Sequence, residues 1–193
     1  PSTYDDSKPY ALIVALHGYG SDANDMATTW REAAAKIGAV LIAPQALEPA
    51  GRGFSWGVVE QGDFLVLRAM EKAKAEHNID STRIILTGFS QGGAMCFTLA
   101  VRHPDLFVGV IPVAGYYEHR VDPIPSQPGS KLPRFVIMVG DKDQPADNNR
   151  DVAKRLEAIG VPVQLKVYPN LGHTFPPNRQ TEMDSALRFV LQN

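Results

Sequence analysis

The chain has 193 residues, which predicts one domain because domains commonly hold about 150 residues. Its 19 basic and 21 acidic residues give a net charge of -2, which excludes the dense positive surface that nucleic-acid binding requires. The single cysteine, Cys96, excludes an intrachain disulfide and any zinc site built from several cysteines.

The apolar runs of the sequence are short. The longest covers residues 11–16, far below the roughly 20 residues that a membrane-spanning helix needs. We therefore expect no transmembrane segment. No signal peptide is visible, but the chain begins with Pro1 rather than Met, so the sequence assigns it to no compartment.

Six apolar runs with little polar alternation predict strands that are covered on both faces. In chain order they are residues 10–16, 39–43, 83–87, 108–113, 134–139 and 163–168. Residues 116–133, between the fourth and fifth runs, are rich in proline and could be an interdomain linker or a surface excursion. The regular pattern that follows favours the excursion, and its length is too small for a helical cap domain.

Helical spacing of apolar residues fills most of the segments between these runs. The predicted stripes are Met26, Trp30, Ala33 and Ile37; Phe64, Leu67 and Met70; Met95 and Leu99; Val152, Leu156 and Ile159; and Met183, Leu187 and Val190. Ser21 and Asp22 precede the first stripe as candidate helix caps. Strands that alternate with helices predict an α/β fold, with a mainly parallel sheet of about six strands and helices on both faces.

The strongest chemical signal is the sequence Gly-Phe-Ser-Gln-Gly that follows the third run, centred on Ser90. A serine at a sharp turn between strand and helix has strained backbone geometry, so the residues two before and two after it must be small. Gly88 and Gly92 meet this requirement. The pattern predicts that Ser90 is a nucleophile above the edge of the sheet.

A serine hydroxyl needs a base to remove its proton. Of the five histidines, only His173 lies in a loop after a predicted strand and downstream of a suitable acid, at the sheet edge where ligands of α/β proteins bind. The acid must orient the imidazole and stabilise its charged form. Asp143, after the fifth run, is the predicted acid, and Asp141 is the alternative.

Acyl transfer also needs backbone N–H groups that point at the developing oxyanion. The N–H of Gln91, directly after the serine, is one predicted donor. The N–H of Tyr19 is the other, because Gly18 and Gly20 on either side let this backbone approach closely.

The segments LIVALHGYGSD, LTGFSQGGAM, MVGDKDQPAD and LGHTF carry a resemblance to a known family. Residues 11–175 resemble an α/β-hydrolase of the esterase type, close to the phospholipase/carboxylesterase and dienelactone-hydrolase-like families. The resemblance implies an α/β-hydrolase fold without a cap domain. It also implies Ser90 as nucleophile, Asp143 as acid, His173 as base, and Tyr19 and Gln91 as oxyanion donors.

The start of the chain departs from this family. The fold usually opens with an antiparallel hairpin before the strand that carries His-Gly, and only nine residues precede Tyr10. We therefore expect residues 1–193 to form one α/β-hydrolase domain that lacks the leading hairpin or is cut from a longer protein.

Three aromatic residues near the predicted site are candidates for lining a substrate pocket. Trp56 lies in a glycine-rich loop after the second run, and Tyr116 and Tyr117 follow the fourth run. For each of them the alternative is packing in the core. The sequence contains no phosphate-binding glycine loop and no metal-ligand cluster, so we expect neither a cofactor nor a metal.

These residues together predict a serine hydrolase acting on carboxylic esters through an acyl-enzyme on Ser90. With no large lid, the site is expected to be open and to accept short or medium acyl groups, or a bulky ester presented from outside. The expected substrate is a small-molecule or carbohydrate-linked ester. An acyltransferase or thioesterase, a carbon–carbon bond hydrolase or lyase, and a binding module without catalysis are the alternatives.

Overall fold

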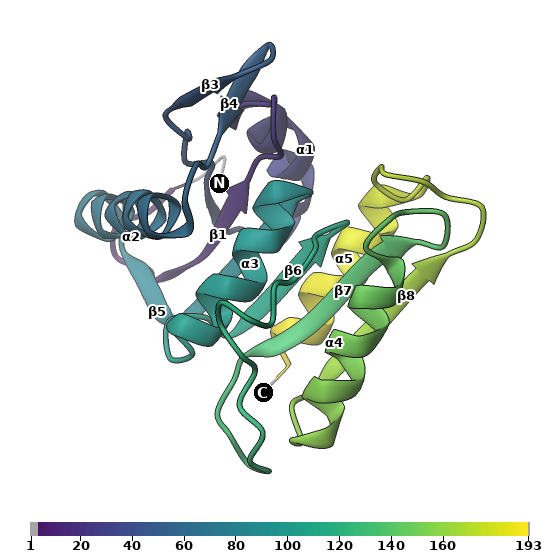
Figure 1. Cartoon of the computed structure of the whole chain (residues 1–193). Helices are drawn as coiled ribbons and strands as arrows, with labels where there is room; N and C mark the ends of the chain where they lie inside the picture. The colour runs from purple at the N-terminus through teal and green to yellow at the C-terminus, as the bar shows by residue number, and fades with distance from the viewer. Residues whose placement is uncertain (1–3, 193) are drawn as a thin grey trace.

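The structure, a computed structural model, describes residues 4–192. All six predicted apolar runs are strands: β1 (Tyr10–Leu16), β2 (Val40–Ile42), β5 (Ile79–Phe89), β6 (Gly109–Val113), β7 (Arg134–Gly140) and β8 (Val163–Tyr168). They form one sheet in the order β2-β1-β5-β6-β7-β8, in which every neighbouring pair is parallel (Figure 1). The predicted parallel sheet is confirmed.

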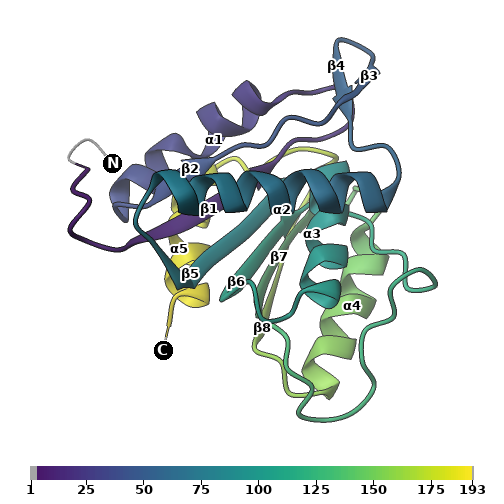
Figure 2. The same ribbon diagram turned by 90° about the vertical axis from the view of Figure 1, so that its left-hand side faces the viewer.

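Helices cover both faces of this sheet, as the alternating pattern predicts. The helices are α1 (Ala23–Lys36), α2 (Val59–Glu76), α3 (Gln91–Arg102), α4 (Ala146–Ala158) and α5 (Arg179–Val190). The first and last pack on one face and the other three on the opposite face. Figure 2 shows that α2 lies near β1 and β2, the two strands at one lateral edge of the sheet.

The strand β1 shows why these runs lack polar alternation. Leu12, Val14 and Leu16 pack in the core cluster under α2, α3 and α4. Ala11 and Ile13 point to the other face, in the cluster that α1 and α5 cover. Since both faces are buried, every position in the strand is apolar, as in other parallel sheets.

A short antiparallel hairpin, β3 (Glu48–Ala50) with β4 (Gly53–Ser55), was not predicted. Its strands of three residues are too short for a visible alternation. Tertiary contacts hold it instead: the Gly20 N–H donates to the Phe54 carbonyl at 3.0 Å, and the Phe54 N–H donates to the Ser21 carbonyl at 2.9 Å. The hairpin therefore lies against the loop that follows β1.

The helix boundaries follow local signals. Asp22 is the N-cap of α1, and its side chain accepts a hydrogen bond from the Asp25 N–H at 3.0 Å, which confirms one of the two predicted caps. The apolar stripe predicted for α2 is wrong at Phe64, whose side chain is 63% exposed. The helix approaches α3 at Gly62, where an added Cβ would lie 2.7 Å from Met95 Cε. This close contact turns Phe64 to the opposite side of the helix.

The segment between β6 and β7, residues 114–133, contains no helix or strand. It is the predicted surface excursion and forms no cap domain. Across residues 4–192, no helix is long and apolar enough to cross a membrane.

Candidate active site

Ser90 occupies the turn between β5 and α3, at the carboxyl edge of the sheet. Its backbone has φ 56° and ψ -115°, a left-handed conformation that costs a non-glycine residue about 1–3 kcal/mol. The Ser90 N–H donates to the Val113 carbonyl at 2.9 Å, and the Ser90 carbonyl accepts from the Ala94 N–H at 2.9 Å. The neighbouring strand and the first turn of α3 thus hold the strained turn in place.

The glycines around Ser90 let the turn form. A Cβ on Gly88 would lie 2.4 Å from the Gly92 carbonyl oxygen, and a Cβ on Gly92 would lie 2.3 Å from the Leu16 carbonyl oxygen. Both positions therefore exclude any side chain, which confirms the reasoning that they must be small. Gly18 also lies against the turn, since its added Cβ would be 3.2 Å from Ser90 Cβ.

His173 lies in the loop after β8, and its side chain reaches Ser90 at the carboxyl edge of the sheet. Its Nε2 lies 2.8 Å from Ser90 Oγ. Its Nδ1 lies 2.9 and 3.0 Å from the two carboxylate oxygens of Asp143. The structure therefore brings together the three predicted residues, in an arrangement in which the serine can pass its proton to the imidazole.

Asp143 lies in the loop after β7, and its side chain is only 3% exposed. The Lys142 N–H donates to the Leu171 carbonyl at 3.0 Å, which joins the acid loop to the histidine loop. Within residues 4–192, the alternative acid Asp141 forms no hydrogen bond or ion pair with His173, and its buried Oδ1 has no hydrogen-bond partner. The geometry favours Asp143 over Asp141 as the residue that orients the imidazole.

The two predicted oxyanion donors lie next to this arrangement. Among the described residues, neither the N–H of Tyr19 nor that of Gln91 has a hydrogen-bond partner. The Gln91 side chain is turned away, because its Oε1 accepts from the Trp56 N–H at 3.2 Å and its Nε2 donates to Ser55 Oγ at 3.1 Å. Both backbone groups remain available for a substrate oxygen, and their role stays a prediction.

Two buried aromatic residues support the loop that carries Tyr19. His17 is fully buried; its Nδ1–H donates to the Gly18 carbonyl at 2.8 Å and its Nε2 accepts from the Ala46 N–H at 3.2 Å. Burial lowers the pKa of this imidazole below its ordinary value. The Trp56 indole N–H donates to the His17 carbonyl at 2.8 Å. The prediction that Trp56 lines the pocket is therefore wrong: its ring is buried and supports the loop from behind.

A cavity of about 160 Å³ opens beside Ser90 and His173. Its other lining residues are Gln91, Ala94, Ala114, Tyr116, Gln144 and Pro145. Tyr116 lies where the sequence places it, but Tyr117 does not: its ring is buried, and its hydroxyl donates to the Asp122 carbonyl. Gln144 and Pro145 were missed, although their position directly after the predicted acid places them at the same edge.

Within residues 4–192, no group of three or more histidine, cysteine, aspartate or glutamate side chains is arranged to hold a metal ion. The acidic and basic side chains that gather away from Ser90 pair with each other. The largest such group surrounds Arg102, at the end of α3.

The parallel sheet with helices on both faces, and a serine at a strand-to-helix turn, define the α/β-hydrolase fold. The chain belongs to the dienelactone hydrolase family, which matches residues 50–188. The crystal structure of esterase PE8 has the same fold, with a TM-score of 0.81 and 21% identity over 97% of this chain and 96% of that one.

Two curated relatives are similar to this chain over part of their length. Poly(3-hydroxyalkanoate) depolymerase C of Paucimonas lemoignei is 33% identical over 113 residues, which are 54% of this chain and 27% of the relative. A probable feruloyl esterase C of Aspergillus terreus is 33% identical over 122 residues, or 60% of this chain and 44% of the relative. The chain thus spans less than half the length of either.

Proposed function

We propose that this chain is a serine hydrolase that cleaves carboxylic esters through an acyl-enzyme on Ser90. The observation that carries the proposal is the continuous set of contacts from Ser90 Oγ to His173 Nε2, and from His173 Nδ1 to Asp143. The names of the two relatives, an esterase and a depolymerase, support the same class of reaction.

Each residue has a defined part in the proposed reaction. His173 takes the proton of Ser90 as Oγ attacks the ester carbonyl, and Asp143 stabilises the imidazolium that forms. The N–H groups of Tyr19 and Gln91 donate to the oxyanion of the tetrahedral intermediate. His173 then gives its proton to the departing alcohol, and water attacks the acyl-enzyme with His173 again as the base.

The shape of the site favours hydrolysis of esters whose bulk stays outside the protein. The cavity of about 160 Å³ is smaller than the 300–1,000 Å³ or so of typical ligand pockets. It suits a short or medium acyl group, with the alcohol part, small or carbohydrate-linked, left in solvent. The His173 side chain is 48% exposed, so water can reach the acyl-enzyme, which favours hydrolysis over transfer to another acceptor.

The test compares Ser90→Ala with the wild-type protein on p-nitrophenyl acetate. Loss of the nucleophile should lower kcat on the order of 10⁶-fold. Ser126→Ala, an exposed serine in the excursion between β6 and β7, serves as the matched control and should keep wild-type activity. Full activity of the Ser90 variant would overturn the proposal.

The same assay separates the proposal from its alternatives. A matched pair of ester and thioester substrates compares esterase with thioesterase activity. Added methanol shows whether an alcohol competes with water for the acyl group, as in an acyltransferase. A binding module without catalysis would turn over none of these substrates.

A further inference from the structure

Tyr116 is an exposed aromatic residue beside the nucleophile. Its ring is 50% exposed and lines the cavity beside Ser90 and His173. Within residues 4–192, no hydrogen bond is made by its hydroxyl group. Among these described residues no hydroxyl contact anchors the ring, so the backbone on either side of it is important for its position.

The backbone before Tyr116 is fixed by close contacts. Ala114 has φ 52°, and its N–H donates to the Met138 carbonyl at 2.8 Å. A Cβ on Gly115 would lie 2.4 Å from the Gly93 carbonyl carbon, so this segment packs directly on the first turn of α3. These contacts fix the direction of the backbone between the end of β6 and Tyr116.

Two asparagines in the first turn of α4 hold the residues on both sides of Tyr116. The Asn148 amide binds the backbone of Tyr117 twice: its Oδ1 accepts from the N–H at 2.8 Å, and its Nδ2 donates to the carbonyl at 2.9 Å. Asn149 is fully buried, and its Nδ2 donates to the Gly115 carbonyl at 2.6 Å. The asparagine amide offers both the donor and the acceptor that the Tyr117 backbone requires.

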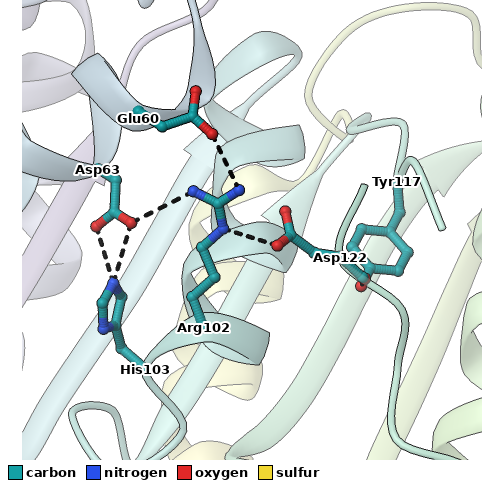
Figure 3. Close-up of polar contacts among 6 residues, drawn as sticks. All are labelled: Glu60, Asp63, Arg102, His103, Tyr117 and Asp122. Atoms are coloured by element: carbon teal, nitrogen blue, oxygen red, sulfur yellow. Dashed lines mark hydrogen bonds and ion pairs between the residues drawn. The ribbon is translucent and has the colours of Figure 1, made fainter. Parts of the chain in front are cut away.

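A second set of contacts holds Tyr117 from the opposite side. Its hydroxyl donates to the Asp122 carbonyl, and the Asp122 carboxylate accepts from Arg102 Nε at 2.7 Å. Figure 3 shows Arg102 between Asp122 and the acidic residues of α2, with Glu60 at 3.4 Å and Asp63 at 3.6 Å. The segment after Tyr116 is thus tied to both α3 and α4.

The first turn of α4, which carries the asparagines, is joined to the loop that carries the acid of the proposed reaction. The Ala146 N–H donates to the Asp143 carbonyl at 3.1 Å, and the Asn149 N–H donates to the Pro145 carbonyl at 2.8 Å. One helical turn therefore contacts both the backbone of Asp143 and the backbone on either side of Tyr116.

We propose that Tyr116 is a specificity-determining residue, against which a flat apolar group of the ester packs, and that Asn148 is the positioning residue that holds it there. The proposal rests on the serine hydrolase function proposed above. A half-exposed ring beside the nucleophile offers a face for offset stacking. Asn148 touches no substrate and acts through the Tyr117 backbone.

The test measures kcat and KM for ethyl acetate, phenyl acetate and ethyl 3-phenylpropanoate. The readout is selectivity, the ratio of kcat/KM for an aromatic ester to that for ethyl acetate. Tyr116→Ala should lower this ratio about threefold to tenfold for at least one aromatic ester, mainly through KM, because ring stacking is lost. Asn148→Ala should lower the same ratio.

The double variant distinguishes positioning from general stability. If Asn148 acts through Tyr116, the variant with both alanines should have the same selectivity as Tyr116→Ala alone. Asn178→Ala, at the start of α5 where the side chain makes no cap hydrogen bond, is the matched control and should behave as wild type. Asn148→Asp keeps the size and the acceptor but loses the donor, so it gives the same test if Asn148→Ala does not fold.

Any one of three outcomes would overturn the proposal. The first is that Tyr116→Ala leaves the selectivity unchanged, and the second is that the losses of selectivity in the two single variants multiply in the double variant. The third is that Asn148→Ala lowers activity equally on all three esters. In each of these cases the serine hydrolase function still stands if Ser90→Ala is inactive on ethyl acetate. A wild-type protein that hydrolyses none of the esters would overturn both proposals.

Discussion

The Nε2 atom of His173 lies 2.8 Å from the Oγ atom of Ser90, although 83 positions separate the two residues in the chain. The contact exists because both follow strands of one parallel sheet, whose carboxyl ends share an edge. Asp143 reaches the same place from the loop after β7. The predictions below follow from this arrangement and from the contacts that support it.

Asn in place of Asp143 should lower kcat by about 10⁴-fold, because a neutral amide neither fixes the imidazole tautomer nor stabilises its charge. Asp141→Asn is the matched control, since among the described residues Asp141 forms no hydrogen bond or ion pair with His173, and it should remain active. Ester hydrolysis by the purified variants, each checked for folding by circular dichroism, measures both. Equal losses in the two variants would contradict the assignment of the acid.

The sequence predicts much of this site because its signals are local. The strained serine turn requires Gly88 and Gly92, and a buried apolar run precedes it. His173 and Asp143 follow predicted strands, so the parallel sheet brings them to one edge. Nothing in the spacing of residues separates Asp143 from Asp141; that choice depends on which carboxylate the loop turns toward the imidazole.

The two wrong predictions of pocket residues concern side chains whose burial depends on packing above the sheet edge. Trp56 and Tyr117 follow strands, as pocket residues do, but their polar atoms reach the carbonyls of His17 and Asp122 and their rings are buried. The contact of Asn148 with Tyr117 spans 31 positions, and an asparagine at the start of a helix is indistinguishable in sequence from an ordinary cap.

Gly140→Ala should destabilise the protein and separate the acid loop from the histidine loop. An added Cβ would lie 2.1 Å from the Leu171 carbonyl oxygen, and such overpacking costs about 1–3 kcal/mol. Gly172→Ala is the control, because nothing lies within 4 Å of its added Cβ. Urea unfolding at neutral pH measures both; equal stability of the two variants would contradict the close approach of the loops.

Arg102→Leu should lower the free energy of unfolding by about 2–4 kcal/mol, because the Asp122 carboxylate, which is 13% exposed, would stay mostly buried without its cation. Lys72→Ala removes an exposed ion pair with Glu76, at 3.8 Å, and should cost less than about 0.5 kcal/mol. Thermal or urea unfolding compares the two. A loss for the Arg102 variant no larger than for the control would show that the group in Figure 3 contributes little.

His17 makes a contribution to stability that depends on pH. Burial lowers its pKa, so the unfolded chain binds the proton more readily than the folded protein. The neutral imidazole therefore stabilises the fold above pH 6.5, the ordinary value for histidine, and this contribution is lost as the pH falls below it. The difference in unfolding free energy between wild type and His17→Asn should shrink from about pH 7.5 to about pH 5.5. A difference that stays constant would contradict a neutral, buried His17.

The most direct measurement of the central claim is the site at which a fluorophosphonate reacts. An activated Ser90 should form a covalent adduct, and mass spectrometry of the digested protein should locate that adduct on the peptide containing Ser90. Ser90→Ala should give no adduct, and Ser126→Ala should react as wild type. No adduct in the wild-type protein, or an equal adduct in Ser90→Ala, would contradict the proposal that Ser90 is the nucleophile.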